Sequence, residues 1–233
     1  MTMKNKVAVV TGASRGIGFA IATELAKMGY SLGLIARSQA DIEEASRKIC
    51  EQFPGVKVIA AAFDVVDDEN SKEFIRRVCT ELGYISVLVN NAGVYKQGTS
   101  STPIEEVKRS IDVNFLAAVR FVQAVIPSMK KLGHGYIFNI ASLAGVEAFA
   151  DTGSYSASKF ALVGYSSSLA QELAPMGIKV TALCPSWVNT KNSKGAPVKP
   201  EQMIKTDDIA LTVRYLLSLG PTASVPEIII RCK

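Results

Sequence analysis

The sequence predicts a single α/β domain built on a doubly wound parallel sheet of about seven strands, with helices on both faces. Short β-branched runs alternate with longer amphipathic stretches along nearly the whole chain. The strand candidates are almost continuously apolar, as in Val7-Ala8-Val9-Val10, which is typical of a sheet covered on both faces. No linker-like change of composition interrupts this alternation, so residues 1–233 are interpreted as one domain.

The elements follow one another in strict order. Apolar, β-branched runs predict strands at 7–11, 31–36, 57–63, 87–90, 135–141, 178–183 and 227–230. Apolar residues at helical spacing predict helices at 16–28, 39–52, 69–82, 103–131, 154–174 and 207–218. Parallel strands require right-handed crossovers, so these helices divide between the two faces of the sheet.

Composition excludes several classes of protein. Hydrophobic residues make up 48% and charged residues 20%, which excludes a disordered chain. The net charge of +5 is spread along the chain rather than clustered, so no nucleic-acid partner is expected. The polar start at 1–6 lacks a signal-peptide pattern, and no apolar run approaches the ~18–20 residues of a bilayer span. We expect a cytoplasmic protein with no membrane partner.

The cysteines do not form a metal-binding or disulfide pattern. Cys50, Cys79, Cys184 and Cys232 are scattered, without a CxxC pair. No metal site is therefore expected. His134, the only histidine, lies between two glycines and is predicted to be exposed; its isolation excludes a Ser–His–Asp hydrolase.

The least regular stretch is 186–206, which contains Gly195, Pro197 and Pro200. It is long for a connection in a compact domain, and such connections often form lids or binding loops. It follows the carboxyl end of a predicted strand, the side on which open α/β sheets bind ligands. We interpret it as a substrate loop, with an ordinary surface loop as the alternative.

A glycine-rich turn joins the first strand to the first helix. Residues 11–18 read Thr-Gly-Ala-Ser-Arg-Gly-Ile-Gly, with glycines spaced G-x-x-x-G-x-G. Such glycines let backbone N–H groups and the positive end of the helix approach a pyrophosphate. In the first strand–turn–helix unit of the chain, this pattern indicates a dinucleotide site.

The end of the second strand indicates which dinucleotide binds. An acidic residue there would bond the ribose hydroxyls of NAD and repel a 2′-phosphate. Here Ala36 is neutral and Arg37 is basic, and Arg15 lies in the glycine turn. Two guanidinium groups can hold a phosphate, so NADP(H) is predicted over NAD(H). The alternative is that Arg37 is a solvated charge at a strand end.

Tyr155 and Lys159 open a predicted helix at positions i and i+4, so they share one face. A free tyrosine titrates near pH 10. A neighbouring ammonium and the positive helix end favour the phenolate, which predicts a lowered pKa for Tyr155. Tyr155 is therefore a candidate general acid or base.

Together with other motifs, these residues resemble the short-chain dehydrogenase/reductases of the compact, one-domain type, from about residue 6 to residue 230. The glycine turn reads as TGxxxGxG, and residues 90–93 read NNAG after the fourth strand. Ser142 stands thirteen residues before Tyr155, and residues 185–190 resemble the family's PGxVxT. The resemblance implies a Rossmann-type fold and NADP-dependent oxidoreductase activity, nearest in pattern to 3-oxoacyl-thioester and broad ketone reductases.

The resemblance also implies roles for the catalytic residues. Ser142 and Tyr155 would bond the substrate carbonyl oxygen, with Tyr155 as the proton donor. Lys159 would bind the nicotinamide ribose and lower the pKa of Tyr155. Asn114 would hold a water that links Lys159 to solvent. The implied cofactor-binding set is Gly12, Ser14, Arg15, Gly16, Ile17, Gly18, Arg37, Asp64, Val65, Asn90, Ala92, Gly93, Tyr155, Lys159, Pro185, Val188 and Thr190.

Two features depart from the family pattern. Ser186 stands where the family usually has glycine, and residues 226–231 lack the Gly-Gly pair that often belongs to an oligomer-forming tail. By resemblance, helix faces at 103–131 and 154–174 would form a homodimer interface, and the chain is expected to be a homodimer or a homotetramer.

The sequence thus predicts an NADPH-dependent reductase of a small-molecule carbonyl substrate. An apolar substrate is expected if the pocket is lined by the hydrophobic side chains near the site, which are Leu143, Val146, Phe149, Trp187 and Met203. The alternatives are a catalytically silent NADPH-binding sensor or scaffold, which would not need the Asn114–Ser142–Tyr155–Lys159 set, and an NAD-dependent alcohol oxidase.

Overall fold

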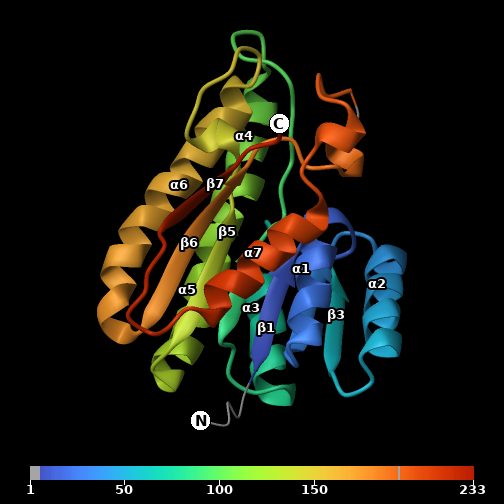
Figure 1. The fold of residues 1–233 in the computed structure, drawn as a ribbon, viewed down its shortest axis with the longest axis vertical. Helices are drawn as coiled ribbons and strands as arrows, with labels where there is room; N and C mark the ends of the chain where they lie inside the picture. The colour runs from blue at the N-terminus through green and yellow to red at the C-terminus, as the bar shows by residue number, and fades with distance from the viewer. Residues whose placement is uncertain (1–5, 194) are drawn as a thin grey trace.

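The structure is a computed structural model that describes residues 6–193 and 195–233 (Figure 1). Residues 1–5, most of the predicted polar start, and residue 194 of the predicted substrate loop lie outside the described residues.

Seven parallel strands form one sheet in the order β3-β2-β1-β4-β5-β6-β7. Their bounds are β1 Val7–Thr11, β2 Ser31–Ala36, β3 Val58–Ala62, β4 Val87–Asn90, β5 Gly135–Ile140, β6 Ile178–Pro185 and β7 Glu227–Ile230. The strand order runs outward from β1 in one direction and from β4 in the other. The predicted doubly wound, Rossmann-type sheet is confirmed, with its switch point between β1 and β4.

The helices cover both faces of this sheet (Figure 1). Their bounds are α1 Gly16–Lys27, α2 Gln39–Gln52, α3 Asp68–Glu81, α4 Ile104–Ile111, α5 Ala117–Leu132, α6 Gly153–Leu173 and α7 Thr206–Ser218. One hydrophobic cluster joins the sheet to α1, α2 and α7, and a second joins it to α3, α5 and α6.

Strand β1 shows how the sequence supplies both clusters. Its side chains point alternately to the two faces of the sheet. Ala8 and Val10 pack in the α1 cluster, whereas Val7 and Val9 pack in the α3 cluster. A strand buried on both faces needs apolar residues at every position, and this is why its sequence does not alternate.

The structure differs from the single long helix predicted at 103–131. This stretch is divided into α4, a π-helical turn at Asp112–Leu116, and α5. The π-turn is closed by a bond from the Ala117 N–H to the Asp112 carbonyl, one residue longer than an α-helical bond. The other predicted bounds agree with the structure to within one or two residues.

By length and composition alone, the continuous helical stretch Ile104–Leu132 could cross a bilayer. This observation differs from the expectation that no stretch would reach that length. In the fold, Phe121, Val125 and Met129 of this stretch are buried against the sheet, as in a core helix.

The topology places a crevice at the carboxyl ends of the strands. Open parallel sheets bind ligands outside these ends, at the point where the strand order reverses. The loops after β1, β4, β5 and β6, which carry most of the predicted site residues, all leave the sheet at this edge.

Candidate active site

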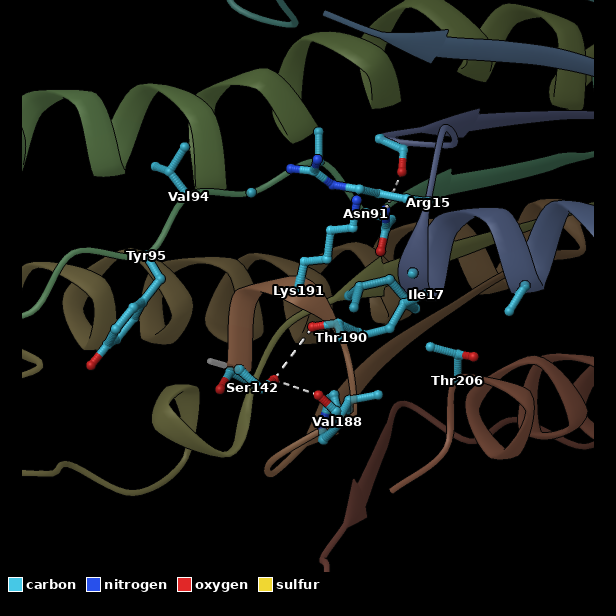
Figure 2. Close-up of a pocket in the computed structure, with 18 of the residues that line it drawn as sticks. Arg15, Ile17, Asn91, Val94, Tyr95, Ser142, Val188, Thr190, Lys191 and Thr206 are labelled. Atoms are coloured by element: carbon cyan, nitrogen blue, oxygen red, sulfur yellow. Dashed lines mark hydrogen bonds between the residues drawn. The ribbon is translucent and has the colours of Figure 1, made fainter. Parts of the chain in front are cut away.

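A cleft of about 1660 Å³ lies along this edge of the sheet. It brings together most of the residues that the sequence singled out. Figure 2 labels Arg15, Ile17, Ser142, Val188 and Thr190 among them. The predicted residues that line it are Gly12, Ser14, Arg15, Gly16, Ile17, Arg37, Asp64, Val65, Ala92, Gly93, Ser142, Tyr155, Lys159, Pro185, Val188 and Thr190. The predicted residues Gly18, Asn90 and Asn114 lie behind this lining.

The glycine turn is built by close packing. Gly12 has a φ of +65°, a conformation that L side chains rarely adopt. A Cβ atom at Gly18 would lie 2.3 Å from the Gly12 carbonyl oxygen and 2.4 Å from Asn91 Nδ2. Gly18 therefore supports the turn from behind, while Gly12 and Gly16 form its surface in the cleft.

The turn is tied to the end of β4 by Thr11 and Asn91, two residues that the sequence analysis did not select. The Thr11 hydroxyl oxygen accepts hydrogen bonds from the Asn91 and Ala92 N–H groups, both at 3.0 Å. Asn91 Nδ2 donates to the carbonyls of Thr11 and Gly12, also at 3.0 Å. The TG and NNAG motifs thus form one hydrogen-bonded unit.

Asn90, by contrast, points away from the cleft. Its Nδ2 donates to Asn139 Oδ1 at 2.9 Å, and the side chain is buried in the sheet layer. Asn91 occupies the cleft instead. The sequence pattern alone does not distinguish the two adjacent asparagines. Which of the two side chains faces the cleft depends on where β4 ends, and β4 ends at Asn90.

Helix α1 has an N-terminus that is free to bind an anion. The helices α2 and α3 begin with side-chain caps, in which Ser38 and Asp67 accept hydrogen bonds from the first turn. At α1, Arg15 supplies no such cap, and the first turn contains no acidic residue. The first N–H groups of a helix need partners, and the positive end of the helix dipole attracts negative charge. The turn therefore suits a phosphate group.

Cationic side chains surround this turn. Arg15 and Arg37 both line the cleft, as predicted. Lys191, which the sequence analysis did not select, extends from the loop after β6 toward Arg15 and Asn91 (Figure 2). Thr190 lies beside it, 3.4 Å from the position that a Cβ atom of Gly16 would take. The loop after β6 therefore meets the glycine turn across the cleft.

Asp64 is already paired with a residue of α4. Its Oδ2 lies 2.6 Å from the Arg109 guanidinium, and its Oδ1 accepts a bond from the Val66 N–H. Desolvation acts to raise the pKa of Asp64, but the hydrogen bonds from Arg109 and Val66 outweigh it and hold this pKa below its ordinary value. Arg109 also lines the cleft, and no local motif indicated it.

Lys159 is the buried cation of the site. Its side chain projects from α6, is 4% exposed and donates from Nζ to the Ile140 carbonyl at 2.8 Å. Desolvation lowers its pKa to about 8. Lys159 can therefore lose and regain a proton near neutral pH.

The pKa of the Tyr155 phenol differs from the expectation that it would be lowered. Burial raises its pKa above the ordinary value, and a hydrogen bond with the Ser142 side chain acts in the opposite direction. Lys159 Nζ lies 5.8 Å from the centre of the Tyr155 ring, and its hydrogen bond goes to the Ile140 carbonyl. The phenol is consequently held in its protonated form.

Tyr95 is a further residue that the sequence analysis missed. Its ring meets the Tyr155 ring edge-on, with centroids 5.1 Å apart, and both line the cleft. Tyr95 is 46% exposed and stands at the edge of the cleft (Figure 2). It therefore packs against one side of the Tyr155 ring.

Ser142 lies two residues after the end of β5, and its side chain is hydrogen-bonded to Tyr155. Its hydroxyl oxygen accepts a hydrogen bond from the Ala144 N–H at 3.1 Å. The hydroxyl hydrogen bonds the Tyr155 phenol and can rotate to donate to a ligand instead.

Asn114 lies in the π-turn and holds the chain after β4. Its Oδ1 accepts from the Val94 N–H at 2.8 Å, and its Nδ2 donates to the Val94 carbonyl and to Ser158 Oγ. A Cβ atom at Gly93 would lie 3.3 Å from Asn114 Oδ1 and 3.7 Å from Lys159 Nζ. Asn114 thus joins the π-turn, the NNAG segment and α6 behind the Lys159 ammonium.

Comparison with known proteins agrees with this geometry. The profile of the short chain dehydrogenase family matches residues 6–200. The chain belongs to this family. An uncharacterized oxidoreductase of Staphylococcus epidermidis is 35% identical over 233 residues, which is 98% of each chain.

Two solved structures show the same fold as this short chain dehydrogenase. An alcohol dehydrogenase from Thermococcus sibiricus, complexed with 5-hydroxy-NADP, is 34% identical with a TM-score of 0.90, and the match covers 98% of this chain and 97% of that one. A betaketoacyl-[ACP] reductase from Bacteroides thetaiotaomicron is 38% identical with a TM-score of 0.87, covering 99% and 98%. The chain is therefore an oxidoreductase of the Rossmann-type fold.

The cleft of this short chain dehydrogenase fits a nicotinamide dinucleotide. Backbone N–H groups at an uncapped helix start suit the pyrophosphate. The absence of a Cβ at Gly93 leaves space directly above Lys159 and Asn114. Among the described residues, no group of three His, Cys, Asp or Glu side chains is placed to hold a metal ion.

The loop after β6 is more ordered than a simple connection. Val188 pairs with Ile204 in a short parallel bridge, through bonds from Asn189 N–H to the Ile204 carbonyl and from Ile204 N–H to the Trp187 carbonyl. This bridge closes the base of the loop, while Trp187 and Thr190 line the cleft.

Three of the five apolar residues expected in the pocket line it. Leu143, Phe149 and Trp187 contribute to the cleft surface. Val146 packs instead beside the buried Leu162, and Met203 is buried outside the lining.

Proposed function

We propose that this oxidoreductase uses NADPH to reduce a small-molecule ketone, with a 3-oxoacyl thioester as one candidate, to the alcohol. The observation that carries the proposal is the convergence of Ser142, Tyr155 and Lys159 in one cleft with the α1 turn. The turn suits the phosphates of the cofactor, and the three side chains suit a carbonyl group that is being reduced. The cleft therefore has groups for both the cofactor and the substrate.

The protein's own groups handle the proton. When bound, NADPH supplies a hydride to the carbonyl carbon. Tyr155, whose raised pKa keeps it protonated, donates its proton to the carbonyl oxygen. The Ser142 hydroxyl donates a hydrogen bond to the same oxygen and stabilises its developing negative charge.

The Tyr155 phenolate then regains a proton from the Lys159 side. The Lys159 pKa of about 8 suits a group that receives protons from solvent near neutral pH. Both amide hydrogens of Asn114 are used by Val94 and Ser158. A water that connects Lys159 to solvent would therefore have to donate to an oxygen of Asn114.

The preference for NADPH rests on charge. Arg15, Arg37 and Lys191 line the phosphate end of the cleft, and no acidic residue follows β2 directly. A 2′-phosphate adds negative charge where these cations lie. The related alcohol dehydrogenase complexed with 5-hydroxy-NADP supports the same choice.

The substrate class rests on the cleft lining and on a relative. Leu143, Phe149 and Trp187 favour acyl or alkyl ketones over sugars. The related betaketoacyl-[ACP] reductase supports a 3-oxoacyl group among these.

We further propose that the chain acts as a cytoplasmic homodimer or homotetramer. Phe160 lies 43% exposed on α6, one of the two helices that the family resemblance assigns to the dimer interface. Sedimentation should give a mass at least twice that of the chain; a monomer would contradict this proposal.

The test of the reaction is NADPH and NADH consumption over a panel of ketones and 3-oxoacyl thioesters. We expect turnover with NADPH, and we expect Tyr155→Phe to lower kcat by about 10²–10⁴-fold, the usual contribution of a general acid. NADPH affinity, followed by cofactor fluorescence, should fall far less than kcat in this variant, because the glycine turn and the cationic side chains that bind the phosphates are unchanged.

Tyr84→Phe is the matched control, because Tyr84 is 41% exposed and lies outside the cleft. NADPH binding without turnover on any substrate would favour the silent binder, and a preference for NADH would contradict the role of Arg15 and Arg37.

A further inference from the structure

The two departures from the family pattern contact each other at the substrate end of the cleft. The Ser186 hydroxyl oxygen accepts a hydrogen bond from the Cys232 N–H at 2.8 Å. The Ser186 N–H donates to the Ile230 carbonyl, also at 2.8 Å. A glycine at 186 could not make the first of these bonds. Ser186 therefore anchors the segment 231–233, which follows β7, against the end of β6.

The register of the sheet places this segment beside the reacting groups. Ile140 is level with Leu183, and Pro185 is level with Ile230. Ser142, two residues beyond Ile140, is thus level with Pro185 and Ile230, and Arg231 stands one residue further. Two strand spacings separate the Ser142 and Arg231 backbones, which is about 10 Å. Figure 1 shows β5, β6 and β7 side by side, with the following segment at the same edge.

Arg231 lines the same cleft as Ser142, Trp187 and Phe149. Its guanidinium is held by Glu147, to which NH1 and NH2 each donate one hydrogen bond. The pair uses two of the five N–H donors of the guanidinium. The other three N–H groups remain to be offered to a ligand in the cleft.

The Arg231–Glu147 pair is easily shared or exchanged. The two side chains are 53% and 45% exposed, and ion pairs at such exposure contribute little to stability. A carboxylate or phosphate that enters the cleft can thus take a place on the guanidinium at small cost. Arginine holds such planar or tetrahedral anions through paired hydrogen bonds.

We propose that Arg231 is a specificity-determining residue that selects carbonyl substrates carrying an anionic group a few bonds from the ketone. The inference rests on the proposed reductase function and refines it. The ketone oxygen lies between Ser142 and Tyr155, the carbon chain passes Leu143 and Trp187, and the anion reaches Arg231. Glu147 competes with the substrate for the guanidinium, so it limits the affinity for the anion.

The test compares levulinate with methyl levulinate, which carry the same ketone with and without a negative charge. We expect Arg231→Gln to lower kcat/KM for levulinate by about tenfold, mainly through KM, since one charge-assisted contact is lost. The kcat/KM for the ester should stay within about twofold. Arg231→Lys should restore part of the loss, and Glu147→Gln should raise kcat/KM for levulinate.

Arg77→Gln is the matched control, because Arg77 is 51% exposed, forms an ion pair with Glu81 and lies on α3 outside the cleft. This variant should change kcat/KM for neither levulinate nor its ester. The comparison therefore separates the effect of Arg231 from the general effect of removing one positive charge from the protein. Equal changes for levulinate and its ester in Arg231→Gln, or no change for either, would overturn the proposal.

A binding measurement keeps the two proposals distinguishable. If the wild type reduces neither ketone, the reductase function fails, but calorimetry with unreactive valerate and valeramide still decides the role of Arg231. Tighter binding of valerate, lost in Arg231→Gln, would support the anion contact. Equal binding of the acid and the amide would contradict it.

Discussion

The two halves of the sheet build their parts of the cleft in different ways. On the β1–β4 side, the site is made mainly of backbone: glycines, the uncapped start of α1, and main-chain groups tied together by Thr11 and Asn91. On the β5–β7 side, it is made of side chains held in unusual surroundings, such as the buried Lys159 and the partly buried Tyr155. The first half depends on close approach and the second on desolvation.

This difference determines how each half fails when it is altered. A backbone site loses its shape when an atom is added, because there is no side chain that can move away. A side-chain site keeps its shape but loses its chemistry when a proton or a charge is removed. Substitutions in the two halves should therefore give two distinguishable kinds of failure.

The largest effect is expected from Gly18→Ala in the backbone half. Its Cβ atom would lie 2.3 Å from the Gly12 carbonyl oxygen, so the turn or α1 must shift. We expect a loss of about 3 kcal/mol in the free energy of unfolding, together with weaker NADPH binding. Urea unfolding measures the change in the free energy of unfolding, and cofactor titration measures the change in NADPH affinity.

Gly164→Ala on α6 is the control, because no atom lies within 4 Å of its added Cβ. It should stabilise the protein by about 0.5–1 kcal/mol through its helix preference. If both variants behaved alike, the close packing of the turn would not be the limiting factor.

The double variant Arg15→Ala/Arg37→Ala tests the contribution of positive charge to the backbone half of the site. Both side chains are exposed, so we expect a moderate loss of about thirtyfold in NADPH affinity, equivalent to about 2 kcal/mol. NADH affinity should change little, because it lacks the 2′-phosphate. Fluorescence titration with both cofactors measures the ratio of NADPH affinity to NADH affinity. If this ratio were the same in the variant as in the wild type, the contact of Arg15 and Arg37 with the 2′-phosphate would be contradicted.

Lys159 gives the side-chain half a dependence on pH. Its pKa is lowered from 10.5 to about 8 in the folded chain, so the unfolded chain binds more protons between these values. Stability therefore rises with pH across this window, and the contribution of Lys159 should amount to about 2 kcal/mol between pH 8 and pH 10.

Lys159→Met should remove this contribution, so the difference in unfolding free energy between wild type and variant should depend on pH. The comparison cancels tyrosine ionisation, which affects both proteins. Parallel stability curves from pH 8 to pH 10 would show that Lys159 is not desolvated as described.

The smallest effect is expected from Ser186→Ala. It removes the bond to the Cys232 N–H, which should cost about 1 kcal/mol. NADPH affinity should remain within about twofold, because the anchor lies at the substrate end. A large loss of NADPH binding would mean that Ser186 also shapes the cofactor side.

Local sequence patterns predicted most of the fold and the backbone half of the site. Strands such as β1 and turns such as Gly12–Gly18 depend on neighbouring residues, so their signals are short and complete within the chain. Contacts between distant segments had no such signal. The pairs Asp64–Arg109 and Glu147–Arg231 join residues 45 and 84 positions apart, and only the folded sheet brings them together.

The pKa of Tyr155 shows the same limit for the chemistry. The i, i+4 spacing correctly placed Lys159 near Tyr155, but it carried no information about burial or about the Ile140 carbonyl that the ammonium contacts. The NNAG motif likewise does not specify which asparagine side chain faces the cleft: Asn91 lines it, whereas Asn90 is bonded to Asn139.

The π-turn at Asp112–Leu116 constrains how this chain can vary in length. A π-turn holds one residue more than an α-turn, so deleting one residue there would let α4 and α5 join as one continuous helix. Such a deletion would leave α4 at nearly the same rotation relative to α5, because the π-turn winds its extra residue into about the same angle as an α-helical turn. Arg109 would then stay beside Asp64, whereas Asn114 would lose the π-turn that places it against Val94 and Ser158. A deletion in this turn is therefore expected to cost activity more than stability.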